Sequence, residues 1–246
     1  MTPVTWLLAA IIGLALGLLG GGGSILTVPV FTYLMGYEPR QAIAMSLPVV
    51  GLAAATGAIA ALGSRTLPLR AAVVMGPATM AGSYAGARLA VWFDPRTQLV
   101  LLGVIMLSAA AAMWHRSRAT VAWQATSRPH PLLVVAIGLA VGVITGLVGV
   151  GGGFLLVPAL VIVGGLPMHQ ATSASLLVIA MSASAGLVGY LGQVTFDWQV
   201  VGIFAAVASA GVIVGGRLAG RVPAARLQQG FAALLVVIAL YMLVRG

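Results

Sequence analysis

Two glycine-rich stretches could bind a ligand through the protein backbone. They read GLLGGGGSILTVPVF at residues 17–31 and GLVGVGGGFLLVPAL at residues 146–160. Glycine weakens a helix interior by about 1 kcal/mol relative to alanine, so each run should interrupt a helix. N–H groups left unpaired at such an interruption carry partial positive charge, and glycine lets an anion approach the backbone closely. Both stretches are therefore candidate anion-binding sites.

Backbone donors and nearby hydroxyls would form these sites. The expected substrate-binding residues are Gly21, Gly22, Gly23, Ser24, Ser46, Gly151, Gly152, Gly153, Thr172, Ser173 and Ser175. Each hydroxyl could instead bond back to its own helix or join two helices. Pro29 and Pro158 should shape the backbone, because each lacks an N–H and frees the carbonyl four residues earlier. The helix after the first interruption can begin near Ser24 or only at Pro29.

Polar residues near predicted helix ends are candidates for a gate or a vestibule. Arg88 and Arg217 occupy matching positions, where snorkelling toward lipid headgroups is the default and guiding an anion is the alternative. Gln41 and Gln170 also match, and His169 precedes Gln170 as Arg40 precedes Gln41. Histidine is the side chain type here that titrates near neutral pH.

The elements that position these residues must be membrane helices. The chain is 61% hydrophobic and 6% charged, whereas soluble domains hold about 25% charged residues. Apolar windows of about 20 residues, enough to cross a bilayer, recur along the whole sequence. We predict an all-α, polytopic helix bundle. Its first-half segments are 4–19, 24–36, 41–62, 68–92 and 96–114.

Several function classes are disfavoured. The net charge of +9 comes from arginines at the ends of apolar runs, which indicates membrane anchoring rather than nucleic-acid binding. Cysteine is absent. The glycine runs lack the Lys-Ser/Thr of a phosphate loop, and no H-E-x-x-H motif occurs. We therefore expect no enzyme activity, metal or cofactor; the expected partners are a small anion and the lipid bilayer.

The sequence contains an internal repeat. A shift of 129 residues aligns 13–90 with 142–219 without a gap, and roughly a third of the aligned positions are identical. We predict a first half at 1–114, an inter-half loop at 115–131 and a second half at 132–246. Both halves are expected to lie in the membrane.

The charges favour an inverted repeat. If each glycine-broken stretch is a hairpin that enters and leaves on one side, each half crosses the membrane an odd number of times. One side then holds Arg65, Arg70, Arg116, Arg118, Arg128, Arg217, Arg221 and Arg226 without any acid. The other side holds Arg40, Arg88, Arg96 and Arg245 with Glu38, Asp94 and Asp197. Arginine is enriched on the cytoplasmic side, so both termini should lie outside.

The duplicated glycine-rich Val-Pro motif, together with GARLA at 86–90 and GGRLA at 215–219, resembles the TauE/SafE sulfite exporter family (TSUP, formerly DUF81). The resemblance implies a multi-pass plasma-membrane permease, of the bacterial inner-membrane type, for sulfite, sulfonates or related small anions. None of the three acids lies mid-span, which favours an anion over a cation as cargo. An anion channel and a non-transporting accessory subunit are the alternatives.

Overall fold

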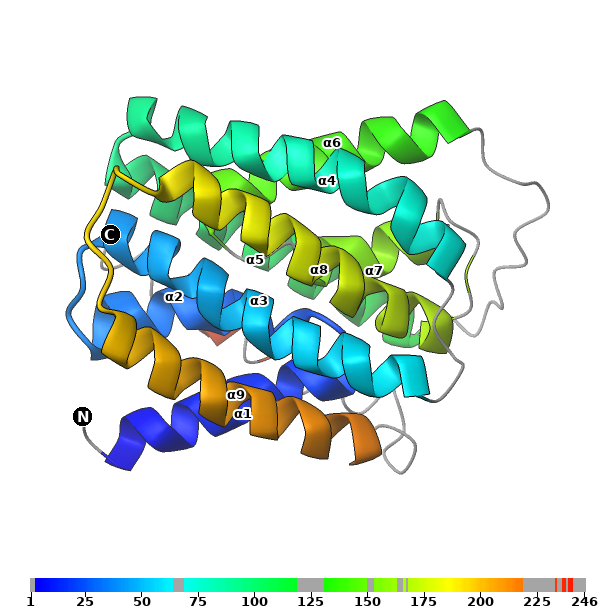
Figure 1. Ribbon diagram of the computed structural model, residues 1–246, viewed down its shortest axis with the longest axis horizontal. Helices are drawn as coiled ribbons and strands as arrows, with labels where there is room; N and C mark the ends of the chain where they lie inside the picture. Colours follow the sequence, from blue (N-terminus) through cyan, green and yellow to red (C-terminus); the bar gives the residue numbers. More distant parts are fainter. Residues whose placement is uncertain are drawn as a thin grey trace.

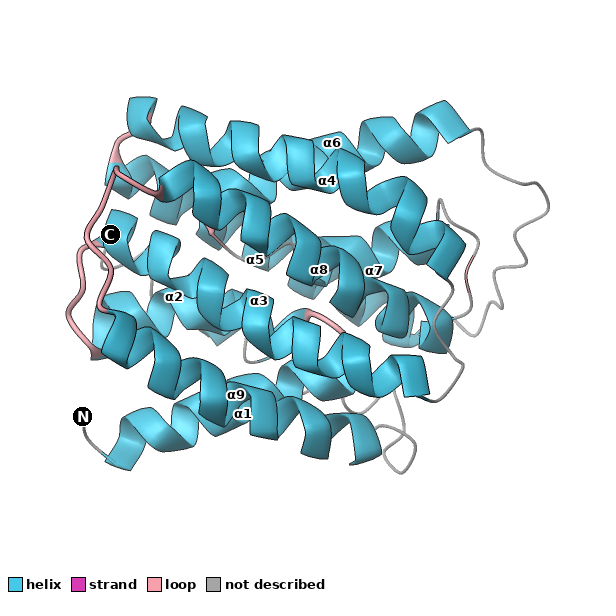
Figure 2. Ribbon diagram, viewed as in Figure 1, coloured by secondary structure: helices cyan, strands magenta, loops and turns pink. Residues whose placement is uncertain are grey.

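The computed structural model describes residues 3–63, 69–118, 131–149, 153–162, 166 and 168–218, with five more residues between 233 and 240. Within these ranges the chain forms helices and no strand (Figure 2). The first-half elements are α1 (Pro3–Leu19), η1 (Gly22–Leu26), α2 (Thr27–Pro29), η2 (Val30–Leu34), α3 (Pro39–Gly63), α4 (Leu69–Leu89), η3 (Ala90–Trp92) and α5 (Pro95–Arg118). The second-half elements are α6 (Pro131–Val148), α7 (Gly153–Ile162), α8 (Met168–Tyr190) and α9 (Trp198–Leu218).

The helix boundaries lie within a few residues of the predicted segments, with one larger difference. The segment predicted at 96–114 is a helix from Pro95 to Arg118, so it runs four residues into the predicted inter-half loop. The residues from His115 to Arg118 are polar, but they are not glycine or proline and can continue a helix that has already formed. The loop between α5 and α6 lies outside the described residues.

The long helices pack side by side in pairs that join the two halves of the chain. Figure 1 shows α1 beside α9, α4 beside α6, and α3 beside α8. Glycines make the outer pairs close: a Cβ added to Gly13 would lie 2.1 Å from the Ala208 carbonyl oxygen. In the other pair, a Cβ added to Gly142 would lie 2.4 Å from the Thr79 carbonyl oxygen. These small residues let helix backbones approach within the membrane.

All three acidic residues lie at one end of the bundle, which we call the acidic end. It consists of the loops at 35–38, 93–94 and 191–197, on the left of Figure 1. Helices α1, α3, α5 and α9 begin there, and α4 and α8 end there. Helices α4, α6 and α8 begin at the other end, which we call the opposite end. Helices α3 and α8 therefore run in opposite directions.

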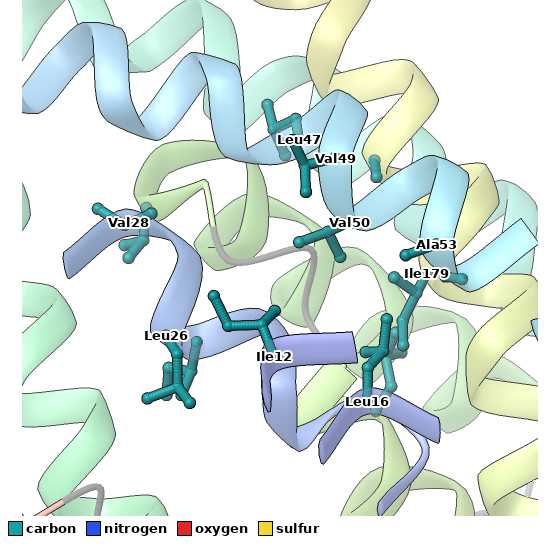
Figure 3. Close-up of a cluster of buried hydrophobic side chains, with 14 of the residues drawn as sticks. Ile12, Leu16, Leu26, Val28, Leu47, Val49, Val50, Ala53 and Ile179 are labelled. Carbon is teal, nitrogen blue, oxygen red and sulfur yellow. The ribbon is translucent and has the colours of Figure 1, made fainter. Parts of the chain in front are cut away.

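Three described helices are long and apolar enough to cross a membrane: Pro39–Leu62, Gln170–Tyr190 and Trp198–Leu218. Trp6–Leu19, Gly22–Leu34, Pro95–Ser108 and Leu132–Val148 are shorter apolar helices. The short helices of the first glycine stretch, Trp6–Leu19 and Gly22–Leu34, pack against the long α3 in the core. Figure 3 shows Ile12 and Leu16 of α1 beside Val50 of α3 and Ile179 of α8.

Candidate functional site

The first glycine stretch is a sharp turn between two helices. Helix α1 ends at Leu19, and the backbone then takes positive φ angles of 68° at Gly20 and 149° at Gly21. Residues with a Cβ rarely adopt such angles, so glycine is needed at both positions. A Cβ on Gly20 would also lie 2.3 Å from Thr172 Cγ2. The glycine run therefore reverses the chain at a point enclosed by protein.

The chain becomes helical again immediately after this turn. The η1 element starts at Gly22, earlier than either start considered from the sequence, Ser24 or Pro29. Pro29 instead ends α2, where the helix changes into the wider η2 turn. Gly22 and Gly23 are thus the first residues of a short helix, whose N–H groups have no partner within that helix. Both are buried.

The second glycine stretch also has a glycine with a positive φ directly after a helix. Helix α6 ends at Val148, and Gly149, the residue 129 positions after Gly20, has a φ of 73°. Gly151 and Gly152 lie outside the described residues. Helix α7 begins at Gly153, and Pro158 lies within it; its side chain is outside the described part.

The two glycine stretches touch each other inside the protein. A Cβ on Gly21 would lie 2.4 Å from the Gly153 carbonyl carbon, and a Cβ on Gly153 would lie 2.4 Å from the Gly21 Cα. Every residue from Leu19 to Phe31 is buried. The backbone donors predicted at the two interruptions therefore come from neighbouring points, but in this conformation they are enclosed.

Three of the predicted hydroxyls bond to backbone carbonyls at the glycine turns. Ser24 Oγ donates to the Gly21 carbonyl at 2.7 Å. Ser46 Oγ donates to the Gly149 carbonyl, and Ser175 Oγ donates to the Gly20 carbonyl. All three serines are fully buried. Their hydroxyl groups bond within the protein in this conformation, which is the alternative to anion binding that the sequence left open.

The other two predicted hydroxyls also lie beside the turns. Thr172 is half-buried and packs its methyl group against Gly20. Ser173 is 8% exposed and has an interaction partner. Thr172 and Ser173 begin the same α8 turn that carries Ser175. The structure thus brings the described predicted binding residues into one region around the two turns.

Of the predicted gate and vestibule residues, Gln41 and Gln170 each lie two residues before a residue that contacts a turn, Ile43 and Thr172 respectively. Arg88 and Arg217 are exposed in the last turns of α4 and α9, as expected of arginines that reach toward headgroups. Gln41 Nε2 donates to the Thr195 carbonyl at 2.9 Å and joins the two halves at the acidic end. Gln170 is exposed near the start of α8, and the side chain of His169 lies outside the described part.

Tyr37 and Asp197 form a second link between the halves at the acidic end. Tyr37 Oη donates to Asp197 Oδ2 at 2.9 Å, and Asp197 Oδ1 accepts from the Val200 N–H at 3.1 Å. Partial burial, and then the Asp197 carboxylate, raise the pKa of Tyr37 to about 12. The Val200 N–H, and then the Tyr37 hydroxyl, lower the pKa of Asp197.

These shifts fix the pH range of the link. The carboxylate's contribution to stability is present above the unfolded pKa of about 3.9 and is lost as pH falls through the lower folded pKa. The tyrosine's contribution is present below its unfolded pKa of about 10 and is lost as pH rises through about 12. The link between Tyr37 and Asp197 is therefore unchanged across neutral pH.

Arg40 supports the same end without an acidic partner among the described residues. Its Nη2 donates to the Phe93 carbonyl at 2.8 Å and to the Ala90 and Val91 carbonyls at 3.3 Å. These carbonyls follow the C-terminus of α4, where the helix dipole favours a cation. Gln98 Nε2 also donates to the Ala90 carbonyl at 2.7 Å. Arg40 therefore fastens α3 to the loop that follows α4.

Comparison with known proteins places this arrangement in a transporter family. The family model described as sulfite exporter TauE/SafE matches residues 5–242. The chain belongs to the TauE/SafE family. A probable membrane transporter protein of Xylella fastidiosa (strain 9a5c) is 30% identical over 96% of this chain and 92% of its own length. The probable membrane transporter protein YunE of Bacillus subtilis (strain 168) is 24% identical over 87% of each chain. No solved structure matches at a significant level.

This TauE/SafE chain also has buried hydroxyls that the sequence did not predict, and two of them lie on the helical segment after the first glycine turn. Thr27 is fully buried, and its Oγ1 has no hydrogen-bond partner among the described residues; Thr32 Oγ1 is in the same situation. A buried hydroxyl without a partner costs about 1–3 kcal/mol. The positions 129 residues later are Leu156 and Val161, so the polar character is confined to the first half. A polar residue in one half opposite an apolar residue in the other was the sequence signal that could have pointed to these hydroxyls.

Proposed function

We propose that this membrane transporter moves small anions, such as sulfite, sulfonates or related sulfur-containing organic anions, across the plasma membrane by alternating access. The observation that carries the proposal is the contact between Gly21 of the first glycine turn and Gly153 at the start of α7; both glycines are buried, and they come from opposite halves of the chain. Backbone N–H groups at such turns can bind an anion without a positively charged side chain. The proposal assigns no catalytic residue, metal or cofactor.

We infer that the two halves are inverted repeats, each with a glycine-broken hairpin. Contacts in one half recur 129 residues later with the halves exchanged: Gly82 meets Leu139, and Gly211 meets Ala10. The same relation links the Gly20 contact with Thr172 to the Gly149 contact with Ile43. Helix α1 begins at the acidic end, and the chain returns to that end after η2. Inverted repeats with broken helices near the midplane are a common transporter design.

The distribution of charge supports an orientation with the acidic end outside. That end holds Arg40, Arg88 and Arg96 with all three acids, whereas the opposite end holds Arg70, Arg116, Arg118 and Arg217. Cytoplasmic loops carry the excess of arginine. With this orientation the N-terminus of α1 lies outside, and an odd number of crossings per half puts both termini there.

The side chains around the turns support an anion rather than a cation as the cargo. The described residues near the turns offer serine and threonine hydroxyls, and none of them is an aspartate or a glutamate. Cation transporters use intramembrane carboxylates to bind the cargo or to relay protons. Backbone and hydroxyl donors suit the oxygens of a sulfite, sulfonate or carboxylate group.

Uptake into liposomes tests the function and its alternatives. The purified protein is screened with sulfite, sulfate, thiosulfate, sulfonates and carboxylates. Saturable flux that a second anion inhibits or exchanges with supports a carrier. Flux that rises linearly with the gradient and ignores competing anions would indicate a channel, and no flux of any of these anions would indicate an accessory subunit.

A matched pair of glycine variants tests the site. Gly22→Val should abolish anion flux, because the side chain fills the space where the first N–H groups of η1 would meet an anion. Gly202→Val is the control, since Gly202 is exposed on α9 and has open space around it. Both variants should elute as folded protein. Wild-type flux through Gly22→Val would contradict the site assignment.

A further inference from the structure

Each half of the chain holds the glycine turn of the other half with one serine. Ser175 Oγ donates to the Gly20 carbonyl, and Ser46 Oγ donates to the Gly149 carbonyl. The two serines are 129 residues apart, as are the two glycines. Both hydroxyls are fully buried. The bond that holds one turn is therefore repeated, with the halves exchanged, at the other turn.

Each serine also has a second acceptor on its own helix. Ser46 Oγ lies 2.6 Å from the Ile43 carbonyl oxygen, and Ser175 Oγ lies 2.7 Å from the Thr172 carbonyl oxygen. A hydroxyl has one hydrogen, so when the turn moves away it can turn fully to its own helix. The serine is then not left without a partner. Such a bond between helix and turn can break and reform at low cost.

The two bonds lie toward different ends of the bundle. Ser46 is seven residues after Pro39, where α3 begins at the acidic end. Ser175 is seven residues after Met168, where α8 begins at the opposite end. At 1.5 Å per residue, each serine lies about 10 Å in from its own end. The Gly149 turn is thus held on the acidic side of the bundle's centre and the Gly20 turn on the opposite side.

Each turn is the tip of a hairpin attached at the far end. The first hairpin starts with α1 and finishes after η2, both at the acidic end, so Gly20 is far from both attachments. The second hairpin starts with α6 at the opposite end, and α8 begins again at that end, so Gly149 is its tip. A hairpin that pivots at its base moves most at its tip. The gap that it leaves is therefore at the end where its serine lies.

We propose that Ser46 and Ser175 are alternating latches, which decide at which end the bundle opens. Release of Gly149 from Ser46 opens the acidic end, and release of Gly20 from Ser175 opens the opposite end. With both bonds formed, as here, the two turns are closed over each other. This inference rests on the proposed function for its purpose, but the bonds and their test require no transported anion.

Single cysteines can report opening at each end, because the chain has no native cysteine. Ala42 and Ala171 are suitable positions: each lies four residues before its serine, on the same helix face, and each is fully buried. The cysteine of Ala42→Cys is therefore shielded while Ser46 holds Gly149, and that of Ala171→Cys while Ser175 holds Gly20. A membrane-impermeant maleimide is applied to detergent-solubilised protein, and the rate of labelling is measured by mass.

The two serine variants should change these rates in opposite ways. Ser46→Ala should raise the labelling rate of Ala42→Cys roughly 2- to 10-fold, the effect of losing one buried hydrogen bond from the closed state, and should leave or lower that of Ala171→Cys. Ser175→Ala should raise the rate of Ala171→Cys by a similar factor and not that of Ala42→Cys. Equal increases at both cysteines, or no increase at either, would overturn the proposal.

Ser184→Ala is the matched control, because Ser184 lies on α8 and its Oγ donates to the Ala180 carbonyl of its own helix at 2.7 Å. It should change neither rate. If Ser46→Ala or Ser175→Ala does not fold, Gly149→Ala and Gly20→Ala can displace the same hairpin tips. The added Cβ would lie 2.5 Å from Ile43 Cγ2 at Gly149 and 2.3 Å from Thr172 Cγ2 at Gly20. They should raise the rates of Ala42→Cys and Ala171→Cys respectively. If the serine variants shift the two labelling rates in opposite ways but the protein carries no anion flux, the transport proposal is rejected and the latch proposal stands.

Discussion

Gly21→Ala tests whether the two glycine turns are in contact. The substitution has two separate costs. Alanine rarely adopts the φ of 149° found at Gly21, and such backbone strain costs about 1–3 kcal/mol. The new Cβ would also lie 2.4 Å from the Gly153 carbonyl carbon and 2.5 Å from the Gly153 carbonyl oxygen. Backbone atoms cannot rotate away as a side chain can, so overpacking adds about 1–3 kcal/mol. The expected loss of stability is about 2–6 kcal/mol.

Two other glycines separate these costs. Gly36 has a φ of 75° and nothing within 4 Å of an added Cβ, so Gly36→Ala carries the backbone cost of about 1–2 kcal/mol alone. Gly216 lies in α9 with open space around it, so Gly216→Ala should be neutral or stabilising by up to about 1 kcal/mol. The difference between Gly21→Ala and Gly36→Ala therefore measures the contact between the turns together with the additional backbone strain at a φ of 149°.

Thermal unfolding in detergent, followed by tryptophan fluorescence or by loss of the monodisperse gel-filtration peak, gives the comparison. At roughly 2–4 °C per kcal/mol for a chain of this size, Gly21→Ala should unfold about 5–20 °C below the wild-type protein and clearly below Gly36→Ala. Equal midpoints for Gly21→Ala and Gly36→Ala would show that Gly21 and Gly153 are not in contact. The account of a site formed by both turns would then be refuted.

Three further outcomes are expected. Tyr37→Phe should loosen the acidic end and raise the maleimide labelling rate of a cysteine placed there. The rate should rise by the same factor at every pH between about 5 and 9, because neither Tyr37 nor Asp197 titrates in that range. A factor that varied across that range would contradict the assigned pKa directions. Thr27→Val should stabilise the anion-free protein by about 1–2 kcal/mol, since it removes a buried hydroxyl without a partner, and should weaken transport if that hydroxyl contacts the anion; thermal unfolding and flux assays measure both. Gly146→Ala should destabilise by about 1–3 kcal/mol, as its Cβ would lie 2.0 Å from the Ser83 carbonyl oxygen; an unfolding midpoint at or above that of the wild-type protein would argue against close packing of α4 on α6.

The helical class and the helix boundaries could be predicted because both follow from local sequence. An apolar run ends where charges, prolines and glycines occur, and the ends of α1 and α3 lie within two residues of the predicted segments. The end of α5 was missed because the polar residues from His115 to Arg118 form a helix nearly as well as apolar ones. Composition reveals what lies in lipid, but a helix can continue past the apolar run.

The positions of the glycine turns follow from the sequence, whereas the hydrogen-bond partners of the serines beside them do not. Repeated glycines indicate a backbone that needs unusual angles or close approach, and Gly20 and Gly149 have positive φ angles. Whether a serine bonds its own helix, a neighbouring helix or an anion depends on what the fold places opposite it. Ser46 and Gly149 are 103 positions apart in sequence, so no local pattern connects them.

The bonds across the halves limit how the protein can move. Helix α1 packs on α9 and α6 packs on α4, with backbone-to-backbone contacts at Gly13 and Gly146 that tolerate little sliding. The contacts at the turns are different in kind, because one hydroxyl with two acceptors holds each tip. Motion should therefore concentrate where bonds can exchange partners, at Gly20 and Gly149, while the glycine-packed pairs move as rigid units. A transporter built this way can open one end without separating its two halves.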